Sequence, residues 1–419
     1  MLADTRRPPP DLAAMRRLVE VLGDPQAASP VIHVTGTNGK TSTARCLTAL
    51  LGAKGLRVGT FTSPHLEAIN ERIAFDGQPI SDDDLAALLG EVASVEPMLG
   101  EDLHLSWFEI LAGAAMRWFA DRPVDVAVLE VGMGGRWDAT NVADAAVAIV
   151  TNVGLDHVEF LGSTHADVAG EKAGVVKPGS TLILGERDPE LRPIFERQDP
   201  AEVWWDGVEY ECVGNELAVG GRVLDLRTPA ASYDGVWLDL HGRYQGDNFA
   251  AALAAAEAFF AGPIDDRLVR EAAATVSSPG RLEIVGRHPL VVLDGAKNLE
   301  GAHRAAEAVA EEFGSATSEI LVVGMLRGKD PADMLEALGV RRSRMVIACP
   351  APSPRTQPVA DVAAAARSFG VEAIEAESVA DALEEAFRRA GPDDLVLVTG
   401  SLYVVGAARA ALAVGSRPT

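Results

Sequence analysis

The segment VIHVTGTNGKTST, residues 31–43, restricts the possible folds of this chain more strongly than any other stretch. A β-branched run leads into a glycine-bounded turn, which is followed by a lysine, small hydroxyl residues and apolar residues at helical spacing. Glycines at a strand-to-helix turn allow backbone amides to approach a phosphate, and the helix N-terminus favours its negative charge. The segment therefore predicts a strand, a phosphate-binding loop and a helix, with Lys40 on the outer phosphates of a triphosphate.

This loop matches the general P-loop pattern only in part. The pattern has a glycine five places before Gly39, where this chain has Val34. The glycines could serve the turn alone, but the flanking strand and helix and the Gly-Lys-hydroxyl core favour phosphate binding. The predicted nucleotide contacts are Gly36, Thr37, Asn38, Gly39, Lys40, Thr41 and Ser42, the last two also near a Mg²⁺ ion.

The rest of the chain has the pattern of an α/β protein. Nearly continuous apolar runs such as residues 124–132 and 145–154 are typical of strands buried on both faces of a parallel sheet. Residues 203–243 show short alternating segments broken by Gly, Asn and Asp, which predicts a small β insertion of antiparallel hairpins. We expect a first domain over residues 1–279, including this insertion, and a smaller doubly wound domain over residues 280–419.

Composition and charge exclude several classes of protein. The 419 residues have a formal net charge of −24, which argues against a general binder of nucleic acid or of membrane surfaces. No run of about 18 apolar residues is present, and the first residues are polar and proline-rich, so we expect a cytosolic protein. Cys46, Cys212 and Cys349 are far apart and predict buried thiols rather than disulfides or a zinc site.

An ordered series of motifs resembles those of the folylpolyglutamate synthase/dihydrofolate synthase family, within the Mur ligase superfamily of ATP-dependent amide-forming enzymes. TGTNGKTS is similar to that superfamily's own P-loop, which lacks the first glycine. The series continues through TSPHLEAINERI (62–73), LEVGMGGRWDATN (129–141), GLDHVEFLGST (154–164), EKAGVVKPG (171–179), GRYQGDN (242–248), SPGRLE (278–283), DGAKN (294–298), GMLRGKD (324–330) and TGSLYVVG (399–406). The resemblance implies an N-terminal ATPase domain, a C-terminal Rossmann-like domain that delivers the amino acid, and a ligand cleft between them.

The implied reaction joins L-glutamate to the carboxylate of a folate or of dihydropteroate. A carboxylate is a poor electrophile at neutral pH, so ATP first converts it to an acyl phosphate. We expect only small-molecule partners and a monomer. The alternatives are a superfamily relative that uses another acid or amino acid, which TSPHL, GGRWDATN and DGAKN disfavour, and a non-catalytic ATP-binding regulator, which would require a broken site.

Two residues at the ends of apolar runs are candidate Mg²⁺ ligands. Glu130 and His157 should emerge at the carboxyl edge of the sheet, where the phosphate-binding loop also opens. The resemblance implies that they coordinate magnesium together with Ser63 of TSPHL. The alternatives are a solvated or capping carboxylate and a histidine satisfied by hydrogen bonds.

The resemblance also implies that Lys172 of EKAG is carbamylated by carbon dioxide and binds the second of two Mg²⁺ ions. The residues alone would favour an ordinary lysine paired with Glu171 or Glu159. Carbamylation requires a site of low dielectric constant that lowers the pKa of the amine.

The remaining nucleotide and pterin contacts are implied by separate motifs. Asn248 matches the adenine-reading asparagine of the family, although it could instead cap a helix. Arg281 and Asp294 match a phosphate-contacting arginine and a ribose-side aspartate. Asp138 matches an aspartate that approaches the pterin ring in dual-function members, but Trp137 precedes it where leucine is usual.

One motif departs clearly from the family. Where the family usually reads DGAHNP, this chain reads DGAKNL, so that Lys297 replaces a histidine facing the glutamate and the acyl phosphate. We expect Lys297 to anchor the glutamate carboxylate. The alternative is that Lys297 faces solvent and that His303 or Ser401 contacts the glutamate. The predicted catalytic set is Lys40, His157, Lys172 and Lys297, with Asp138, Lys297 and Ser401 as substrate contacts.

Overall fold

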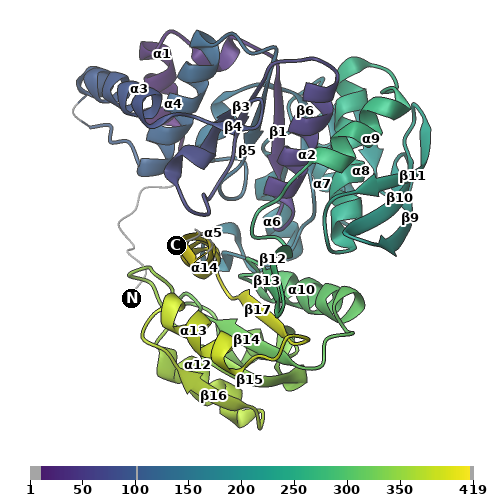
Figure 1. Ribbon diagram of the computed structural model, residues 1–419. Helices are drawn as coiled ribbons and strands as arrows, with labels where there is room; N and C mark the ends of the chain where they lie inside the picture. The colour runs from purple at the N-terminus through teal and green to yellow at the C-terminus, as the bar shows by residue number, and fades with distance from the viewer. Residues whose placement is uncertain (1–10, 101, 416–419) are drawn as a thin grey trace.

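The computed structural model describes residues 11–100 and 102–415, and it contains two helix-covered sheets (Figure 1). We call the part around the eight-stranded sheet the first lobe and the part around the six-stranded sheet the second lobe. In spatial order the first sheet contains β4 (Gln78–Pro79), β3 (Ile73–Phe75), β2 (Val58–Phe61), β5 (Val126–Glu130), β1 (Val31–Thr35), β6 (Ala145–Val150), β7 (Thr181–Leu184) and β8 (Glu202–Trp205). The second contains β12 (Glu283–Arg287), β13 (Leu290–Leu293), β17 (Leu395–Thr399), β14 (Glu319–Val323), β15 (Ser343–Ala348) and β16 (Glu372–Glu375).

Parallel pairing brings the ends of the central strands to one edge of the first sheet. β1 lies between β5 and β6 and is parallel to both, and Val34 is in register with Glu130 on one side and with Ile149 on the other. Every residue of β1 and β5 is buried, which explains their continuous hydrophobic character. The loop after β1, the Glu130 carboxylate and the segment after β6 therefore open at the same edge.

Helices cover both faces of the first sheet. One face packs against α2 (Lys40–Ala53), α8 (Tyr244–Phe260) and α9 (Asp266–Thr275). The other packs against α1 (Ala13–Val21), α3 (Asp82–Val95), α4 (Trp107–Asp121), α6 (His165–Ala173) and α7 (Arg192–Glu196). None of the helices within the described ranges has the length and apolar character needed to cross a bilayer.

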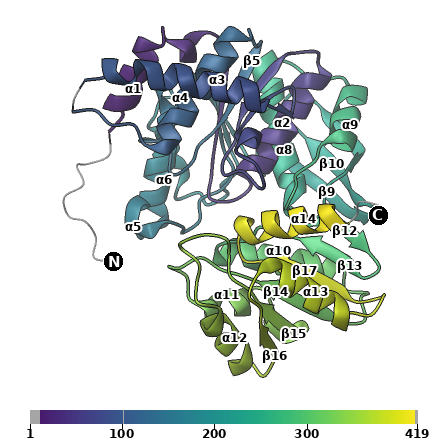
Figure 2. The same cartoon turned by 60° about the vertical axis from the view of Figure 1, so that its left-hand side comes forward.

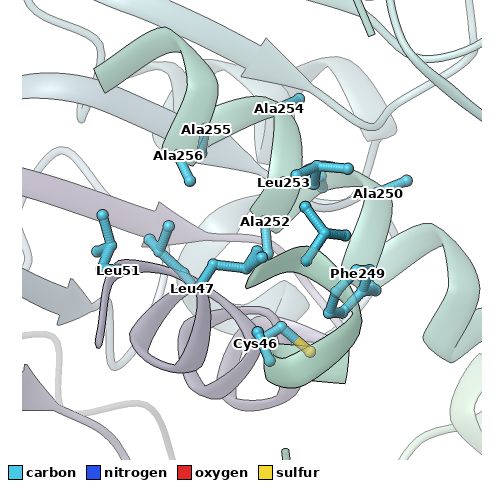
Figure 3. Packing of buried hydrophobic residues seen from close by; sticks show 14 of the residues in the cluster. Cys46, Leu47, Leu51, Phe249, Ala250, Ala252, Leu253, Ala254, Ala255 and Ala256 are labelled. Atoms are coloured by element: carbon cyan, nitrogen blue, oxygen red, sulfur yellow. The ribbon is translucent and has the colours of Figure 1, made fainter. Parts of the chain in front are cut away.

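The packing of α2 against α8 holds the loop between β1 and α2 in place. Figure 3 shows Leu47 and Leu51 of α2 facing Ala252 and Ala256 of α8, all four of them fully buried. Alanines let two helices approach closely at native packing density. The start of α2, and Lys40 with it, is therefore fixed by a rigid contact.

The β insertion is smaller than the sequence indicated. A three-stranded antiparallel sheet is formed by β9 (Glu211–Ala218), β10 (Gly221–Arg227) and β11 (Ser232–Leu238), as the short alternating segments predict. The expectation that the insertion begins at residue 203 is wrong, because β8 pairs in parallel with β7 in the large sheet. Bulky Trp204 and Trp205 suit that position, and only the residues after β8 form hairpins.

The second lobe confirms the predicted second α/β sheet. Its parallel strands are covered on one face by α10 (Leu299–Glu312), α11 (Pro331–Ala337) and α12 (Val359–Ser368), and on the other by α13 (Val379–Arg389) and α14 (Leu402–Gly415). Figure 2 shows α14 between the two lobes. The predicted α/β class with a small β insertion is confirmed. The polar N-terminal stretch, residues 1–10, lies outside the described residues.

Buried charges join the insertion to the second lobe. The Arg222 guanidinium on β10 has no exposed surface and pairs with Glu312 of α10, and with Glu311 at 3.0 Å. The Glu312 carboxylate also contacts His241 Nδ1 at 2.7 Å. These pairs, together with the pairing of Arg409 of α14 with Glu67 of the first lobe, attach the lobes at two separate places.

Candidate active site

The loop between β1 and α2 requires its glycines. Gly39 has a φ of +83°, and a Cβ there would lie 2.3 Å from Asn248 Oδ1. A Cβ on Gly36 would lie 1.8 Å from Thr151 Oγ1. Val34, where a general P-loop has glycine, is a fully buried strand residue and needs no such freedom. The glycines therefore fulfil a steric need, and they also leave backbone amides accessible to an anion.

Lys40 is the first residue of α2 and is directed back over this loop. Its Nζ donates to the carbonyl of Gly36 at 2.9 Å and of Thr37 at 3.5 Å. Burial lowers the pKa of Lys40, and the nearby Glu130 carboxylate opposes that shift. The ammonium group therefore lies against the loop that the sequence predicts to bind phosphate.

Glu130, Thr41 and Ser63 converge beside Lys40. The Thr41 hydroxyl donates to Glu130 Oε1 at 2.9 Å, and the backbone N–H of Ser63 donates to Oε2 at 3.0 Å. Glu130 is 1% exposed, and burial raises the pKa of its carboxyl while the Lys40 charge lowers it. A carboxylate and two hydroxyl groups beside a phosphate loop are oxygen donors of the kind that Mg²⁺ prefers.

The donor set fits a magnesium ion shared with phosphates rather than a cage made of protein alone. Within the described part of the chain, no three His, Cys, Asp or Glu side chains come together as a metal site. Mg²⁺ typically takes only one or two protein carboxylates and completes its shell with phosphate and water oxygens. The residues around Glu130 therefore fit a nucleotide-bound Mg²⁺.

The second lobe supplies the opposite wall of the cleft. Arg281, Asp294 and Lys297 line the cavity that also contains Lys40 and Glu130. The Asp294 carboxylate accepts N–H bonds from Leu282 at 3.1 Å and from Ala296 at 2.9 Å, which fixes its loop. Enclosure in the cleft and the Lys40 charge lower the pKa of Lys297 to about 8. Lys297 is exposed to solvent while its side chain also lines the cavity, so its contact with the glutamate stays a prediction.

Most of the predicted nucleotide contacts share this cavity. Its lining includes the predicted residues Thr37, Asn38, Gly39, Lys40, Thr41, Ser42, Ser63, Glu130, Asn248, Arg281, Asp294 and Lys297. A neighbouring cavity of about 640 Å³ extends the cleft, and four residues line both cavities: Asn152, Tyr244, Asn248 and Arg304. The Asn248 amide donates to Gln245 Oε1 inside α8, so Asn248 does not cap that helix.

Three of these shared residues were missed by the sequence reasoning. Asn152 Oδ1 accepts the backbone N–H of Thr37 at 3.2 Å and of Asn38 at 3.0 Å, so it shapes the loop from the end of β6. Asn152 lies near the end of the apolar run 145–154, and Tyr244 lies in the motif GRYQGDN. A polar side chain just after a strand and an aromatic side chain at the start of a helix were the available signals. Arg304 lies within an alanine-rich helix and gave no signal.

His157 and Lys172 lie outside the lining of the cavity. His157 precedes the short α5 (Val158–Leu161) with a φ of +53°, and partial burial lowers the pKa of its imidazole. Lys172 on α6 is 2% exposed and, within the described residues, forms no ion pair, so the expected alternative partners Glu171 and Glu159 are not used. Burial and the Lys40 charge lower the pKa of Lys172 well below its usual value.

Asp138 and Ser401 serve local structure. The Asp138 carboxylate accepts the backbone N–H of Gly132 at 2.9 Å and of Met133 at 3.1 Å, and it also binds Thr140. Ser401 is 2% exposed, and its hydroxyl accepts the N–H of Val404 at the start of α14. The structure brings neither side chain into the cavity lining. Both residues remain predictions as substrate contacts.

Polar contacts between the lobes close one end of the cleft. Asp156 of the first lobe accepts Lys329 Nζ at 2.8 Å and Asn298 Nδ2 at 3.1 Å. Asn38 of the phosphate loop donates to Glu300 Oε2 at 3.2 Å. Asn298 Nδ2 also donates to Asn38 Oδ1 at 3.1 Å. The phosphate loop is therefore linked directly to the loop and helix that carry Lys297.

Comparison with known proteins supports this arrangement. Residues 109–256 match the Mur ligase middle domain, and residues 280–402 match the Mur ligase glutamate ligase domain. Dihydrofolate synthase/folylpolyglutamate synthase of Mycobacterium tuberculosis is 37% identical to this chain over an alignment of 441 positions, which covers 96% of this chain and 89% of the relative.

Solved structures agree over nearly the full length. M. tuberculosis folylpolyglutamate synthase complexed with ADP has a TM-score of 0.92 at 37% identity, with 99% of this chain and 96% of that chain covered. E. coli FolC in complex with DHPP and ADP has a TM-score of 0.88 at 29% identity, covering 99% and 95%. The Yersinia pestis bifunctional enzyme complexed with AMPPNP and Mn ion has a TM-score of 0.86 at 29% identity, covering 98% and 96%. The chain therefore belongs to the dihydrofolate synthase/folylpolyglutamate synthase family of Mur ligases.

Proposed function

We propose that this protein is an ATP-dependent ligase that adds L-glutamate to the carboxylate of a folate, of dihydropteroate, or of both, through an acyl phosphate. The observation that carries this proposal is one cleft with two unlike walls. The first lobe contributes Lys40 and Glu130, and the second contributes Arg281 and Lys297. The groups proposed to bind the phosphates and the group proposed to bind the amino acid therefore line the same cavity.

Each wall has a defined task in this reaction. The amides of the phosphate loop and Lys40 hold the triphosphate, and Arg281 neutralises its charge from the opposite wall. Magnesium, held by Glu130, the nearby hydroxyls and the phosphates, would screen the anions as the folate carboxylate attacks the terminal phosphorus. Lys297 orients the glutamate so that its amine attacks the acyl carbon and phosphate departs. The closed lobes keep water away from the acyl phosphate.

The finer assignments are part of the same proposal. We propose two Mg²⁺ ions, with His157 and a carbamylated Lys172 as further ligands, adenine contacts from Asn248, and a pterin site near Asp138. The division into domains is proposed near residue 280, between α9 and β12. We also propose a cytosolic monomer. Its three cysteines are free thiols, as expected in a reducing compartment, with Cys46 and Cys349 buried and Cys212 partly exposed.

Phosphate release tests the reaction directly. We expect rapid release from ATP only when glutamate is supplied together with dihydropteroate, tetrahydrofolate or 5,10-methylenetetrahydrofolate. Assays of each acid separately would distinguish dihydrofolate synthase from folylpolyglutamate synthase activity. Release that is independent of glutamate, or faster with a different amino acid, would contradict the proposal.

Changes at the metal site should affect magnesium more than folate. Glu130→Gln and His157→Ala should each raise the Mg²⁺ concentration for half-maximal rate by about tenfold or more, the scale for loss of a group that supports a metal. The KM for the folate should change little. Steady-state rates over a magnesium titration provide the measurement, and Glu159→Gln is the matched control on the adjacent exposed turn. Unchanged magnesium saturation in both variants would remove these residues from the site.

Lys297 should determine the affinity for glutamate. Lys297→Ala should raise the KM for glutamate by about tenfold to a hundredfold, as expected for loss of one charge-assisted hydrogen bond. The KM for ATP should stay nearly constant. Lys297→His restores the residue usual in the family and should recover part of the affinity below the pKa of the imidazole.

The pH dependence follows from the same group. A lysine with a pKa of about 8 is charged below that pH and loses its charge above it, so the glutamate KM should rise by about tenfold between pH 7 and pH 9. Lys297→Arg stays charged over this range and should remove that part of the rise. A wild-type profile identical to that of Lys297→Arg would contradict the assigned role.

A further inference from the structure

A second cavity of about 500 Å³ lies apart from the nucleotide cleft, and the two cavities share no lining residue. Its walls come from α2, the end of β2, the β3–β4 hairpin, the segment 275–279 that joins the lobes, and Arg409 of α14. The volume lies within the range of about 300–1,000 Å³ that is usual for small-molecule sites. Nothing in the proposed reaction uses this cavity.

Arg45 is the unusual group in its wall. It lies on α2 one helical turn beyond Thr41, so both side chains are on the same face of the helix. Among the described residues, the Arg45 side chain forms no hydrogen bond or ion pair, and Glu71 and Glu130 act on it only through space. A partly buried guanidinium with five donors and no protein acceptor is costly unless a ligand satisfies it.

The other strong charges of this cavity already have partners. The Glu71 carboxylate accepts three backbone N–H bonds, each of 2.8 Å, from residues 66–68. Arg409 pairs with Glu67 and, at 3.0 Å, with Glu283. The Asp76 carboxylate, which also lines the cavity, accepts the backbone N–H of Val58 at 2.8 Å. Among the described residues of the lining, Arg45 is therefore the charge without a direct partner, and an occupant that matches it is an anion.

The rest of the lining indicates what kind of anion fits. Small hydroxyl side chains, Thr60 and Thr62, alternate with apolar surface. The apolar lining residues are Ala49, Leu66, Ala74, Pro79, Val276 and Pro279. Inorganic phosphate would leave this apolar surface uncovered, whereas an organic acid would cover it and still present a carboxylate to the guanidinium.

We propose that the cavity beside Arg45 is a second ligand site, which binds a small organic carboxylate through a bidentate pair with the guanidinium. The occupant touches α2, the connecting segment and α14, so it stabilises the observed arrangement of the two lobes. Thr62 lines this cavity and the next residue, Ser63, lines the nucleotide cleft. Binding of a carboxylate in this cavity is thereby linked to the position of Ser63, one of the proposed magnesium ligands.

Calorimetric titration of the full-length protein saturated with ADP tests the site. Glutamate and γ-glutamylglutamate are the carboxylate probes, and inorganic phosphate is the comparison. Arg45→Gln should weaken carboxylate binding by about tenfold or more, the scale for loss of a charge-assisted pair. Ala49→Leu keeps the guanidinium but fills the cavity, and it should weaken binding similarly. Lys297→Ala should leave this binding intact, because its change lies in the other cleft.

The outcomes separate this site from the proposed reaction, because no turnover is measured. Equal affinity in wild type, Arg45→Gln and Ala49→Leu would overturn the site, as would carboxylate binding that only Lys297→Ala removes. Binding of phosphate alone at Arg45 would overturn the assignment to an organic acid. Thermal unfolding of each variant checks the fold, and Ala49→Leu keeps the test decisive if Arg45→Gln fails to fold.

Discussion

Lys40→Ala should reduce turnover by about a hundredfold to a thousandfold, the range for removing one preorganised group that stabilises developing charge. The lysine lies beside the predicted phosphate loop, and among the described residues its Nζ hydrogen-bonds only to the carbonyls of Gly36 and Thr37. Its removal should therefore take a positive charge away from the transferred phosphoryl group. It should leave no cavity in the hydrophobic core, so the stability of the fold should change little. Single-turnover phosphate release, measured beside the melting temperature, would separate these effects.

Lys54→Ala is the matched control for this change. Lys54 lies at the opposite end of α2, where it is exposed and contacts the Phe260 ring. The same substitution there should leave turnover near the wild-type value. Amide formation by Lys40→Ala at the wild-type rate would disprove the assignment of the loop to phosphate.

The second large effect is expected at Lys172. Burial and the Lys40 charge lower the pKa of Lys172 well below its usual value, which increases the fraction of neutral amine, and a neutral amine adds carbon dioxide to give a carbamate and a proton. Activity of enzyme prepared without carbon dioxide should be low and should return on addition of bicarbonate. Lys172→Ala should lose about a hundredfold or more in rate, since the carboxylate that supports the metal is absent.

Carbon-13 NMR with labelled bicarbonate measures the modification independently of activity. A carbamate signal should appear in the wild type and be absent from Lys172→Ala. Lys177→Ala, a nearby lysine that binds the Asn141 carbonyl at 3.3 Å, should retain the signal. Full activity of the wild type without carbon dioxide, with no carbamate signal, would rule out the role.

Local sequence patterns predicted most helices and strands, because an apolar run or a glycine-rich turn marks each of them. The buried strands β1 and β5 read as continuous apolar runs, and the start of α2 is marked by the glycine turn. β8 was misassigned because a short edge strand and a hairpin strand look alike when the partner is unknown. Pairing depends on distant residues, which a local pattern does not contain.

The sequence predicted those residues of the candidate site that lie at or just after the end of a buried strand. Lys40, Thr41 and Glu130 come together because β1 and β5 end at the same edge. Arg304 and Arg45 escaped prediction for a common reason. Each is a charged residue on a helix, where a solvated arginine is the ordinary expectation, and only the fold of both lobes turns it toward a cavity.

The division of tasks between the lobes makes the enzyme modular. We expect the first lobe to bind most of the triphosphate, and the amino acid to bind at Lys297 in the second lobe. Exchanging the second lobe for that of a relative should therefore alter the accepted amino acid and leave the nucleotide unchanged. Such a chimera would have to preserve two ion pairs between the lobes, Asp156 with Lys329 and Arg222 with Glu312. Loss of one partner would leave a buried charge unpaired, which strongly destabilises the folded state. The ion pairs between the lobes, rather than the catalytic residues, therefore determine which second lobes can replace the native one.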